Sequence, residues 1–152
     1  MKRKTALDIA MAYQKHGLAV IPIPFKSKAP VSKGWQDLRI TPETVHEHFN
    51  GKPQNIGVLL GAQSGGVIDI DLDDDIAVQL APAFLKNTAT FGRRSRPASH
   101  YLYRQTANAQ NNTVKFQQPD GKMILEFRSG GSQTVFPGSV HPNVWGQTTF
   151  SA

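Results

Sequence analysis

The sequence contains no cysteine and no apolar run long enough to cross a membrane as a helix. The missing cysteine excludes a disulfide framework and any cysteine-based zinc site, and it fits a reducing compartment, so we expect a cytoplasmic protein that does not contact membranes. The basic start, Met1 to Lys4, precedes an amphipathic segment and not the apolar core of a signal peptide. A chain of 152 residues that is 39% apolar can bury one hydrophobic core, so residues 1–152 should form a single domain.

Acidic residues are scarce outside one short segment. Five of the eleven lie between Asp69 and Asp75, and the rest of the chain has 17 basic residues against six acidic ones, a net charge of +11. A basic body around one acidic spot suits a polyanionic ligand whose phosphates need both Lys or Arg and a bridging cation. Ordinary solubilising charge is the alternative, but the local clustering of the acids favours a nucleic acid or a nucleotide.

The acidic segment begins inside a predicted β-strand. Residues 67–72 alternate with a period of two, which places the isoleucines and the leucine on one face and Asp69 and Asp71 on the other. The two aspartates then have Cα atoms about 6.5–7 Å apart and repel each other unless a cation lies between them. Oxygen ligands suit a hard ion such as Mg²⁺ or Mn²⁺. A solvated acidic turn is the alternative, but it would place the acids beyond the strand.

Capping and turn residues predict a mixed order of helices and strands. A capping box at Thr5 starts a helix that should end near His16, and Thr41-Pro42 starts a second helix. A third helix should lie within 73–86, with Asp73 to Asp75 in its first turn and a kink or break at Pro82. Strands are predicted at 18–23, 56–60, 88–92, 100–104, 114–116, 123–127, 133–136 and 145–150. The strand at 56–60 should form a β-hairpin with 67–72.

The loop from Phe25 to Trp35 is rich in lysine. Lys26, Lys28 and Lys33 could form a basic arm that reaches phosphates, whereas Trp35 is better explained as a packed anchor of the loop. A solvated loop is the alternative, and we expect at least one of the lysines to have a function.

Further candidate site residues lie late in the chain. The strand 123–127 carries one charge, Glu126, on the face opposite Leu125, so this carboxylate either faces solvent or joins the aspartate pair. His100 and His141 follow small residues, in Ala98-Ser99-His100 and Ser139-Val140-His141. Three carboxylates can hold two divalent ions, which activate an attacking hydroxyl and stabilise a leaving pyrophosphate.

Five segments in this order resemble one family. They are Lys28-Ala29-Pro30 with Gly34-Trp35, Val67-Ile68-Asp69-Ile70-Asp71, Ala98-Ser99-His100, Leu125-Glu126, and Phe136-Pro137-Gly138-Ser139-Val140-His141-Pro142. Together they are similar to the bifunctional DNA primase/polymerase (Prim-Pol) domains of plasmids, phages and prophages, in the archaeo-eukaryotic primase superfamily. The resemblance spans about residues 5–150, and it leaves open whether the chain is a minimal domain or a fragment of a longer primase-polymerase/helicase.

The resemblance implies a fold and a reaction. The fold would be α+β, with an N-terminal α/β unit packed on an RNA-recognition-motif-like mixed or antiparallel sheet and the active-site cleft between them. The reaction would be template-directed nucleotidyl transfer on a DNA template and primer, with nucleoside triphosphates, two Mg²⁺ or Mn²⁺ ions and possible help from a replicative helicase. The implied metal ligands are Asp69, Asp71 and Glu126, and the implied nucleotide-binding residues are Lys28, Arg94, Arg96, His100, Ser139 and His141.

Two other functions are compatible with the same residues. One is a catalytically silent nucleic-acid-binding module, for which the basic body alone would suffice. The other is a metal-dependent nuclease or phosphohydrolase, in which the same carboxylates would activate water.

Overall fold

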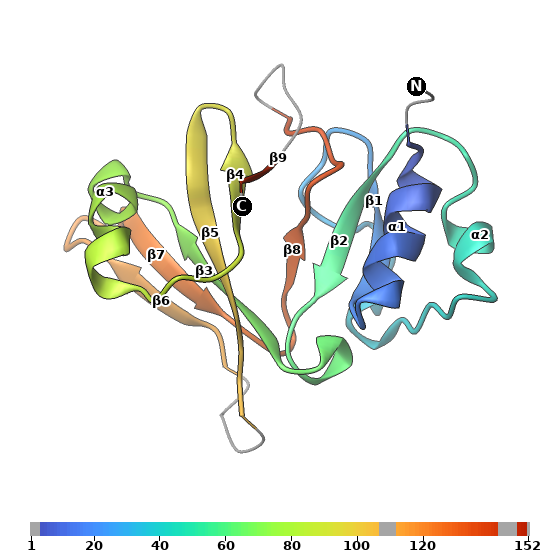
Figure 1. Ribbon diagram of the computed structural model, residues 1–152, viewed down its shortest axis with the longest axis horizontal. Coiled ribbons are helices and arrows are strands. Elements are labelled where there is room, and N and C mark those ends of the chain that lie inside the picture. Colours follow the sequence, from blue (N-terminus) through green and yellow to red (C-terminus); the bar gives the residue numbers. More distant parts are fainter. Residues whose placement is uncertain (1–3, 107–111, 143–148, 152) are drawn as a thin grey trace.

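The computed structural model describes residues 4–106, 112–142 and 149–151 and has the α+β architecture predicted from the sequence. Two antiparallel sheets stand next to each other, with α1 and α2 outside the first and α3 outside the second (Figure 1). The helices are α1 (Ala6–Lys15), α2 (Val45–His48) and α3 (Asp75–Phe84). The strands are β1 (Ala19–Pro24), β2 (Gln54–Leu59), β3 (Val67–Leu72), β4 (Thr90–Arg93), β5 (Arg96–Arg104), β6 (Val114–Gln117), β7 (Met123–Arg128), β8 (Gln133–Val135) and β9 (Thr149–Ser151).

The first sheet has the strand order β1-β2-β8 and packs against α1. The predicted capping box is present, since the Thr5 hydroxyl accepts a hydrogen bond from the Asp8 N–H and the Asp8 carboxylate accepts one from the Thr5 N–H. Buried residues of α1, β1 and β2 form a core that also receives Phe91 from the second sheet. The Phe91 ring lies 5.1 Å from that of Phe136, so this core joins the two sheets.

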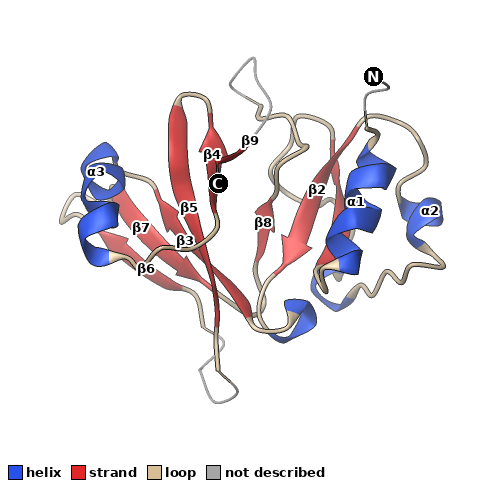
Figure 2. Cartoon of the chain, viewed as in Figure 1, coloured by secondary structure: helices blue, strands red, loops and turns tan. Residues whose placement is uncertain are grey.

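The second sheet has the order β6-β7-β3-β5-β4-β9 and carries α3 on its outer face. Its middle strands lie in the order β7-β3-β5-β4, and α3 connects β3 to β4 along the chain. These elements correspond to the expected RNA-recognition-motif-like half (Figure 2). Ile70 and Leu72 pack towards α3 with Leu125, as the period of two predicts. The aspartates of β3 and Glu126 therefore project from the inner face, towards the first sheet.

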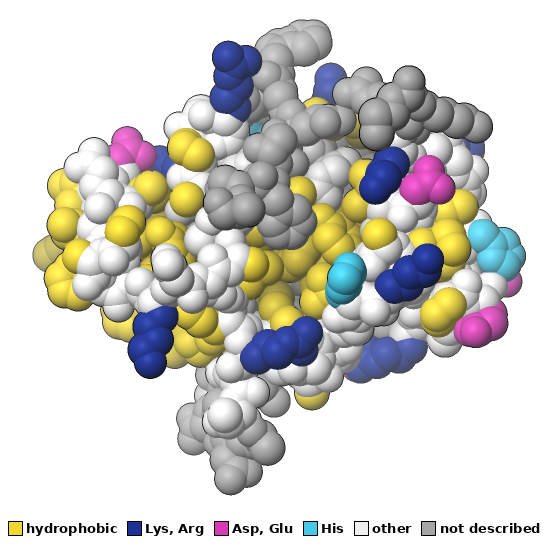
Figure 3. Space-filling view, in the orientation of Figure 1, with side chains coloured by type: hydrophobic (Ala, Val, Ile, Leu, Met, Phe, Trp, Pro, Cys, Tyr) yellow, Lys and Arg dark blue, Asp and Glu magenta, His cyan; other side chains and the backbone are white. Residues whose placement is uncertain are grey.

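The outer side of α3 leaves three apolar side chains exposed, at Ile76, Leu80 and Phe84. Apolar surface is visible at this end of the molecule, at the left of Figure 3. The three exposed side chains lie on the side of α3 that faces away from the sheet, and they are separate from the carboxylate face. Among the described residues, no helix is long and apolar enough to cross a membrane.

Two predictions about individual elements are wrong, and a third is wrong in part. The strands β2 and β3 do not form a hairpin, because the glycines from Gly61 to Gly66 turn the chain out of the first sheet and only a bridge between Gly61 and Val67 links the two. The second helix begins at Val45, after a turn at 42–44, and not at Pro42. The break that was one of the two alternatives at Pro82 does not occur, since α3 continues through Pro82 to Phe84.

The last predicted strand, 145–150, lies largely outside the described residues. Thr149–Ser151 forms β9, which pairs antiparallel with β4 at one edge of the second sheet.

Candidate active site

Strand register brings the predicted acidic residues together. Asp71 on β3 lies directly opposite Glu126 on β7 and, on its other side, opposite His100 on β5. Side chains that are directly opposite in a sheet have Cβ atoms about 4.5–5.5 Å apart. Three adjacent strands therefore present a row of three ionisable groups on the inner face of the sheet.

These groups form two sets that could each hold a metal ion. One set is Asp69, Asp71 and His100, and the other is Asp71, Asp73 and Glu126; within each, the ligand atoms lie within 4.8 Å of one another. Asp71 belongs to both sets, which is the arrangement needed for a carboxylate that bridges two ions. Asp69, two residues before Asp71 on β3, and Glu126, opposite Asp71 on β7, fall in different sets.

Asp73 has a position that the sequence did not indicate. The sequence predicts it in the first turn of the third helix, but α3 begins at Asp75 and is capped by Asp74, whose carboxylate accepts a hydrogen bond from the Ile76 N–H. Asp73 therefore precedes the helix, and its side chain groups with those of Asp71 and Glu126.

Asp69 is fully buried and holds His100 in place. One of its carboxylate oxygens accepts a hydrogen bond of 2.6 Å from the Thr134 hydroxyl and lies 3.0 Å from Nδ1 of His100. The imidazole also stacks on Phe91, with ring centroids 4.5 Å apart. Burial opposes protonation of His100, but the charge of Asp69 and the hydrogen bond to it outweigh burial and raise the pKa of the imidazole.

Asp71 is held in an electrostatically unfavourable position. Burial raises the pKa of its carboxyl to about 6, and the negative charges of Asp69 and Asp73 add to that effect, whereas His100 and Arg128 oppose it. A bound cation would favour the ionised form, because it would add positive charge beside the carboxylate. This is the electrostatic condition expected of a metal-binding carboxylate.

Arg128 lies between the carboxylates of the second set. Its guanidinium is 3.6 Å from Asp71 Oδ2 and 3.6 Å from Glu126 Oε2, and it donates to the Thr134 hydroxyl at 3.3 Å. On the other side of Glu126, the Lys115 ammonium lies 3.5 Å from the carboxylate. These cations offset part of the negative charge in the structure.

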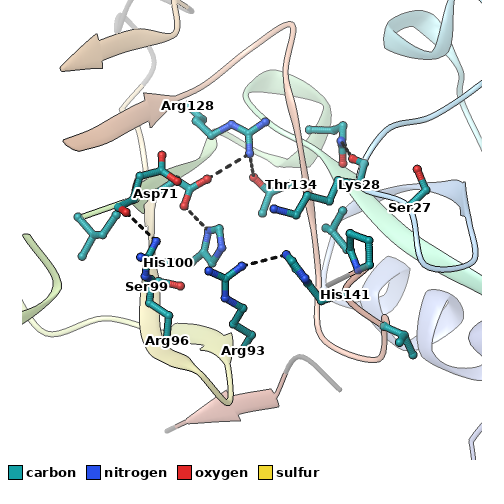
Figure 4. Close-up of a pocket in the computed structure, with 16 residues that line it drawn as sticks. Ser27, Lys28, Asp71, Arg93, Arg96, Ser99, His100, Arg128, Thr134 and His141 are labelled. Carbon is teal, nitrogen blue, oxygen red and sulfur yellow. Dashed lines mark hydrogen bonds and ion pairs between the residues drawn. The ribbon is translucent and has the colours of Figure 1, made fainter. Parts of the chain in front are cut away.

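Beside the carboxylates, a cavity of about 200 Å³ opens between the two sheets (Figure 4). Its lining contains basic side chains from both halves of the molecule, namely Lys28, Arg93, Arg96, His100, Arg128 and His141. Arg93 Nη1 lies 3.0 Å from His141 Nε2 and can donate to it. Burial, together with the charges of Lys28 and Arg93, lowers the pKa of His141, so its imidazole is neutral at pH 7 and accepts that hydrogen bond.

A family model described as "Bifunctional DNA primase/polymerase, N-terminal" matches residues 10–150. The chain belongs to the Prim-Pol family. The match includes nearly all of the span of about 5–150 given for the resemblance, and it confirms that resemblance. A search of curated proteins found no match.

The Prim-Pol cavity contains four of the six residues expected to bind the nucleotide. Lys28, Arg96, His100 and His141 line it, although Arg96 is also paired with Asp75 at 3.0 Å. Arg94 is exposed in the turn between β4 and β5 and does not line the cavity. Ser139 is buried, and its hydroxyl accepts a hydrogen bond from the Ile56 N–H, which gives it a structural role in this arrangement.

Two arginines of the cavity were not among the residues predicted from the sequence. Arg93 is two residues after the buried Phe91 on β4, and Arg128 is two residues after Glu126 on β7. The period of two along each strand places them on the same face as those residues. Extending the predicted strands by one residue would have identified both.

Proposed function

We propose that this Prim-Pol domain catalyses template-directed nucleotidyl transfer, as a DNA primase/polymerase of a plasmid, phage or prophage, with two divalent metal ions. The observation that carries the proposal is the position of Asp71, which is shared by two ligand sets beside a basic cavity of about 200 Å³. Binding of nucleic acid by a basic surface alone would not require carboxylates beside the basic cavity, and an acidic cluster alone would not require that cavity.

The donor atoms fit Mg²⁺ or Mn²⁺. Asp71, Asp73 and Glu126 offer only carboxylate oxygens, which these hard ions prefer. In the other set, Nδ1 of His100 faces Asp69, so the imidazole is better placed to act through Nε2 on a phosphate, and Asp69 and Asp71 would hold the second ion. Two bound ions would activate the 3′-hydroxyl of a primer and neutralise charge on the departing pyrophosphate.

The basic side chains would bind the triphosphate. Lys28 reaches the cavity from the first sheet, and Arg93 and Arg96 reach it from the β4–β5 hairpin of the second, so phosphates would be held from both sides. Arg128 is near the Asp71 and Glu126 carboxylates and also lines the cavity, so it can shift from the carboxylates to the phosphates when metal ions take its place.

A primer-extension assay tests this function. Purified protein is incubated with a primed DNA template and labelled deoxynucleotides or ribonucleotides, with Mg²⁺ or Mn²⁺, and the same reactions are run without a primer. Wild type should incorporate nucleotides, Asp71→Asn should reduce the rate at least about 100-fold, and the exposed Asp37→Asn control should act like wild type.

Two results would contradict the proposal. Extension by Asp71→Asn at the rate of wild type would show that the carboxylate set does not carry the reaction. Cleavage of the template in reactions that lack nucleotides, with no extension when they are added, would indicate a nuclease.

A further inference from the structure

The turn that follows β1 is fixed at the edge of the cavity by buried amides. The Asn55 side chain is fully buried and donates to the carbonyls of Ser27 at 2.9 Å and Val140 at 2.8 Å, and the Gln133 amide donates to the carbonyl of Lys28 at 2.9 Å. Asn55 thus ties this turn to the segment that carries His141. Ser27 and Lys28 line the cavity as a result (Figure 4).

Phe25 and Lys26 form the corner of that turn, which is closed by a hydrogen bond of 2.9 Å from the Ser27 N–H to the Pro24 carbonyl. Phe25 follows a strand of buried residues, yet it is 45% exposed, and the Lys26 ammonium lies 5.6 Å from the centre of its ring. Lys26 has a φ of 60°, a conformation that favours glycine or asparagine. A strained lysine beside an exposed aromatic ring points to a use for both side chains.

The charged residues of the segment that contains this turn are of one sign. No acidic residue occurs between Asp8 and Asp37, whereas the loop itself contains Lys26, Lys28 and Lys33. An exposed aromatic ring among lysines, with no acid nearby in the sequence, is the combination that binds single-stranded nucleic acid, because the ring stacks on a base while the ammonium groups contact phosphates.

We infer that Phe25 and Lys26 form a binding site for a single nucleic-acid strand at the edge of the cavity, with an unpaired base stacked on Phe25. The inference rests on the proposed function, in which that strand is the template and the base lies next to the incoming nucleotide. Lys28 faces the cavity and Phe25 lies three residues before it, so the turn can contact the nucleotide and the template strand together.

Fluorescence anisotropy with a labelled 12-nucleotide single-stranded DNA tests the site. Phe25→Ala should weaken binding about tenfold, since stacking of one base contributes a factor of this order, and Phe25→Trp should retain the affinity. Phe116→Ala on β6 is the matched control, because Phe116 has a similar exposure of 50% and lies on the edge strand of the other sheet. Lys26→Gln should reduce the slope of log K against log salt by about 0.7, the value for one phosphate contact on a single strand.

Two further ligands check that a base is stacked and that the effect is local. With an oligonucleotide whose sites are all abasic, Phe25→Ala and wild type should bind alike; a single-stranded RNA of the same sequence reports whether the sugar matters. Stabilisation by Mn²⁺ plus a nucleoside triphosphate, read as a thermal shift, should be the same for Phe25→Ala and wild type, because Phe25 does not line the cavity.

The results separate this inference from the proposed function. If Phe25→Ala and Lys26→Gln bind the oligonucleotide as wild type does, the site is wrong even when wild type extends primers. If they lose affinity while wild type neither extends primers nor responds to the nucleotide, the strand-binding site is supported and the polymerase assignment is overturned.

Discussion

Replacing Asp71 by asparagine should stabilise the protein in the absence of metal ions. The Asp71 side chain is 19% exposed, and the pKa of its carboxyl is about 6 against an ordinary value of 3.8. At 1.36 kcal/mol per pKa unit, the ionised carboxylate costs up to about 3 kcal/mol of folding free energy above pH 6. Asparagine keeps the shape of the side chain and removes the charge.

The sign of the pH dependence follows from the direction of the pKa shift. A carboxyl with a raised pKa binds its proton more tightly in the folded state, so wild type should lose stability as the pH rises from about 4 to about 6. Asp71→Asn should lack this loss. At pH 8 its melting temperature should exceed that of wild type by up to about 6–12 °C, and at pH 4 the two values should converge.

Thermal denaturation at pH 4, 6 and 8 in EDTA measures this difference. Asp37→Asn, an exposed charge removal, should follow wild type at every pH. Adding Mn²⁺ at pH 8 should reverse the order, because the ion binds the folded wild type through Asp71 and stabilises it by mass action. A variant that is less stable than wild type at pH 8 in EDTA would refute the view that the folded structure holds this carboxylate at an energetic cost.

Three other changes test separate parts of the site. In the absence of nucleotide, Arg128→Met should bind Mn²⁺ several-fold more tightly than wild type, because a competing cation has been removed from Asp71 and Glu126. The same variant should bind a nucleoside triphosphate about tenfold more weakly. Unchanged Mn²⁺ affinity, measured by calorimetry, would contradict this. Asn55→Ala should lower the free energy of unfolding by about 2–4 kcal/mol in a urea titration, because it leaves the buried polar groups of two loops without partners, and a loss below about 0.5 kcal/mol would argue against its anchoring role. Gly92→Ala should weaken nucleotide binding. The added Cβ would clash with the carbonyl oxygen of Arg96 and lie 2.9 Å from the backbone nitrogen of Ala98, so it would displace the hairpin that carries Arg93 and Arg96. Unaltered nucleotide binding by calorimetry would exclude that hairpin from the phosphate site.

Alternation along the strands predicted the acidic face correctly. The period of two places Asp69 and Asp71 on one face of residues 67–72 and Glu126 on the face opposite Leu125, either towards solvent or beside the aspartates. In the structure, β3 and β7 pair so that Asp71 lies opposite Glu126. A period of two depends only on backbone geometry, so it can be read without knowledge of the tertiary fold.

The pairing of strands could not be predicted in the same way. Residues 56–60 and 67–72 are near in sequence and both suit a strand, which favours a hairpin, but β2 pairs with β1 and β8 while β3 pairs with β5 and β7. The choice is made by burial, since the described residues of β2 from Asn55 to Leu59 are all buried and fit the middle of the first sheet. Such long-range packing leaves no local signal.

The same limit applied to individual site residues. Asp73 is followed by two acids that cap and begin α3, so the sequence alone cannot distinguish it from them. Only the observed cap at Asp74 shows that Asp73 precedes the helix. Arg93 and Arg94 are adjacent in the sequence, but Arg93 is the last residue of β4 and lines the cavity, whereas Arg94 lies in the exposed turn.

The number of Mn²⁺ ions bound per chain tests the central claim most directly. Titration of the protein with Mn²⁺ in the presence of a non-hydrolysable nucleoside triphosphate, followed by electron paramagnetic resonance of the free ion, gives this number. If Asp71 is shared by two metal sites, wild type should bind two ions, and Glu126→Gln and Asp73→Asn should each bind one. Asp71→Asn should bind no ion with an affinity comparable to that of wild type. Equal binding by wild type and Asp71→Asn, after correction for ions held by the nucleotide alone, would contradict a shared carboxylate at the centre of the site.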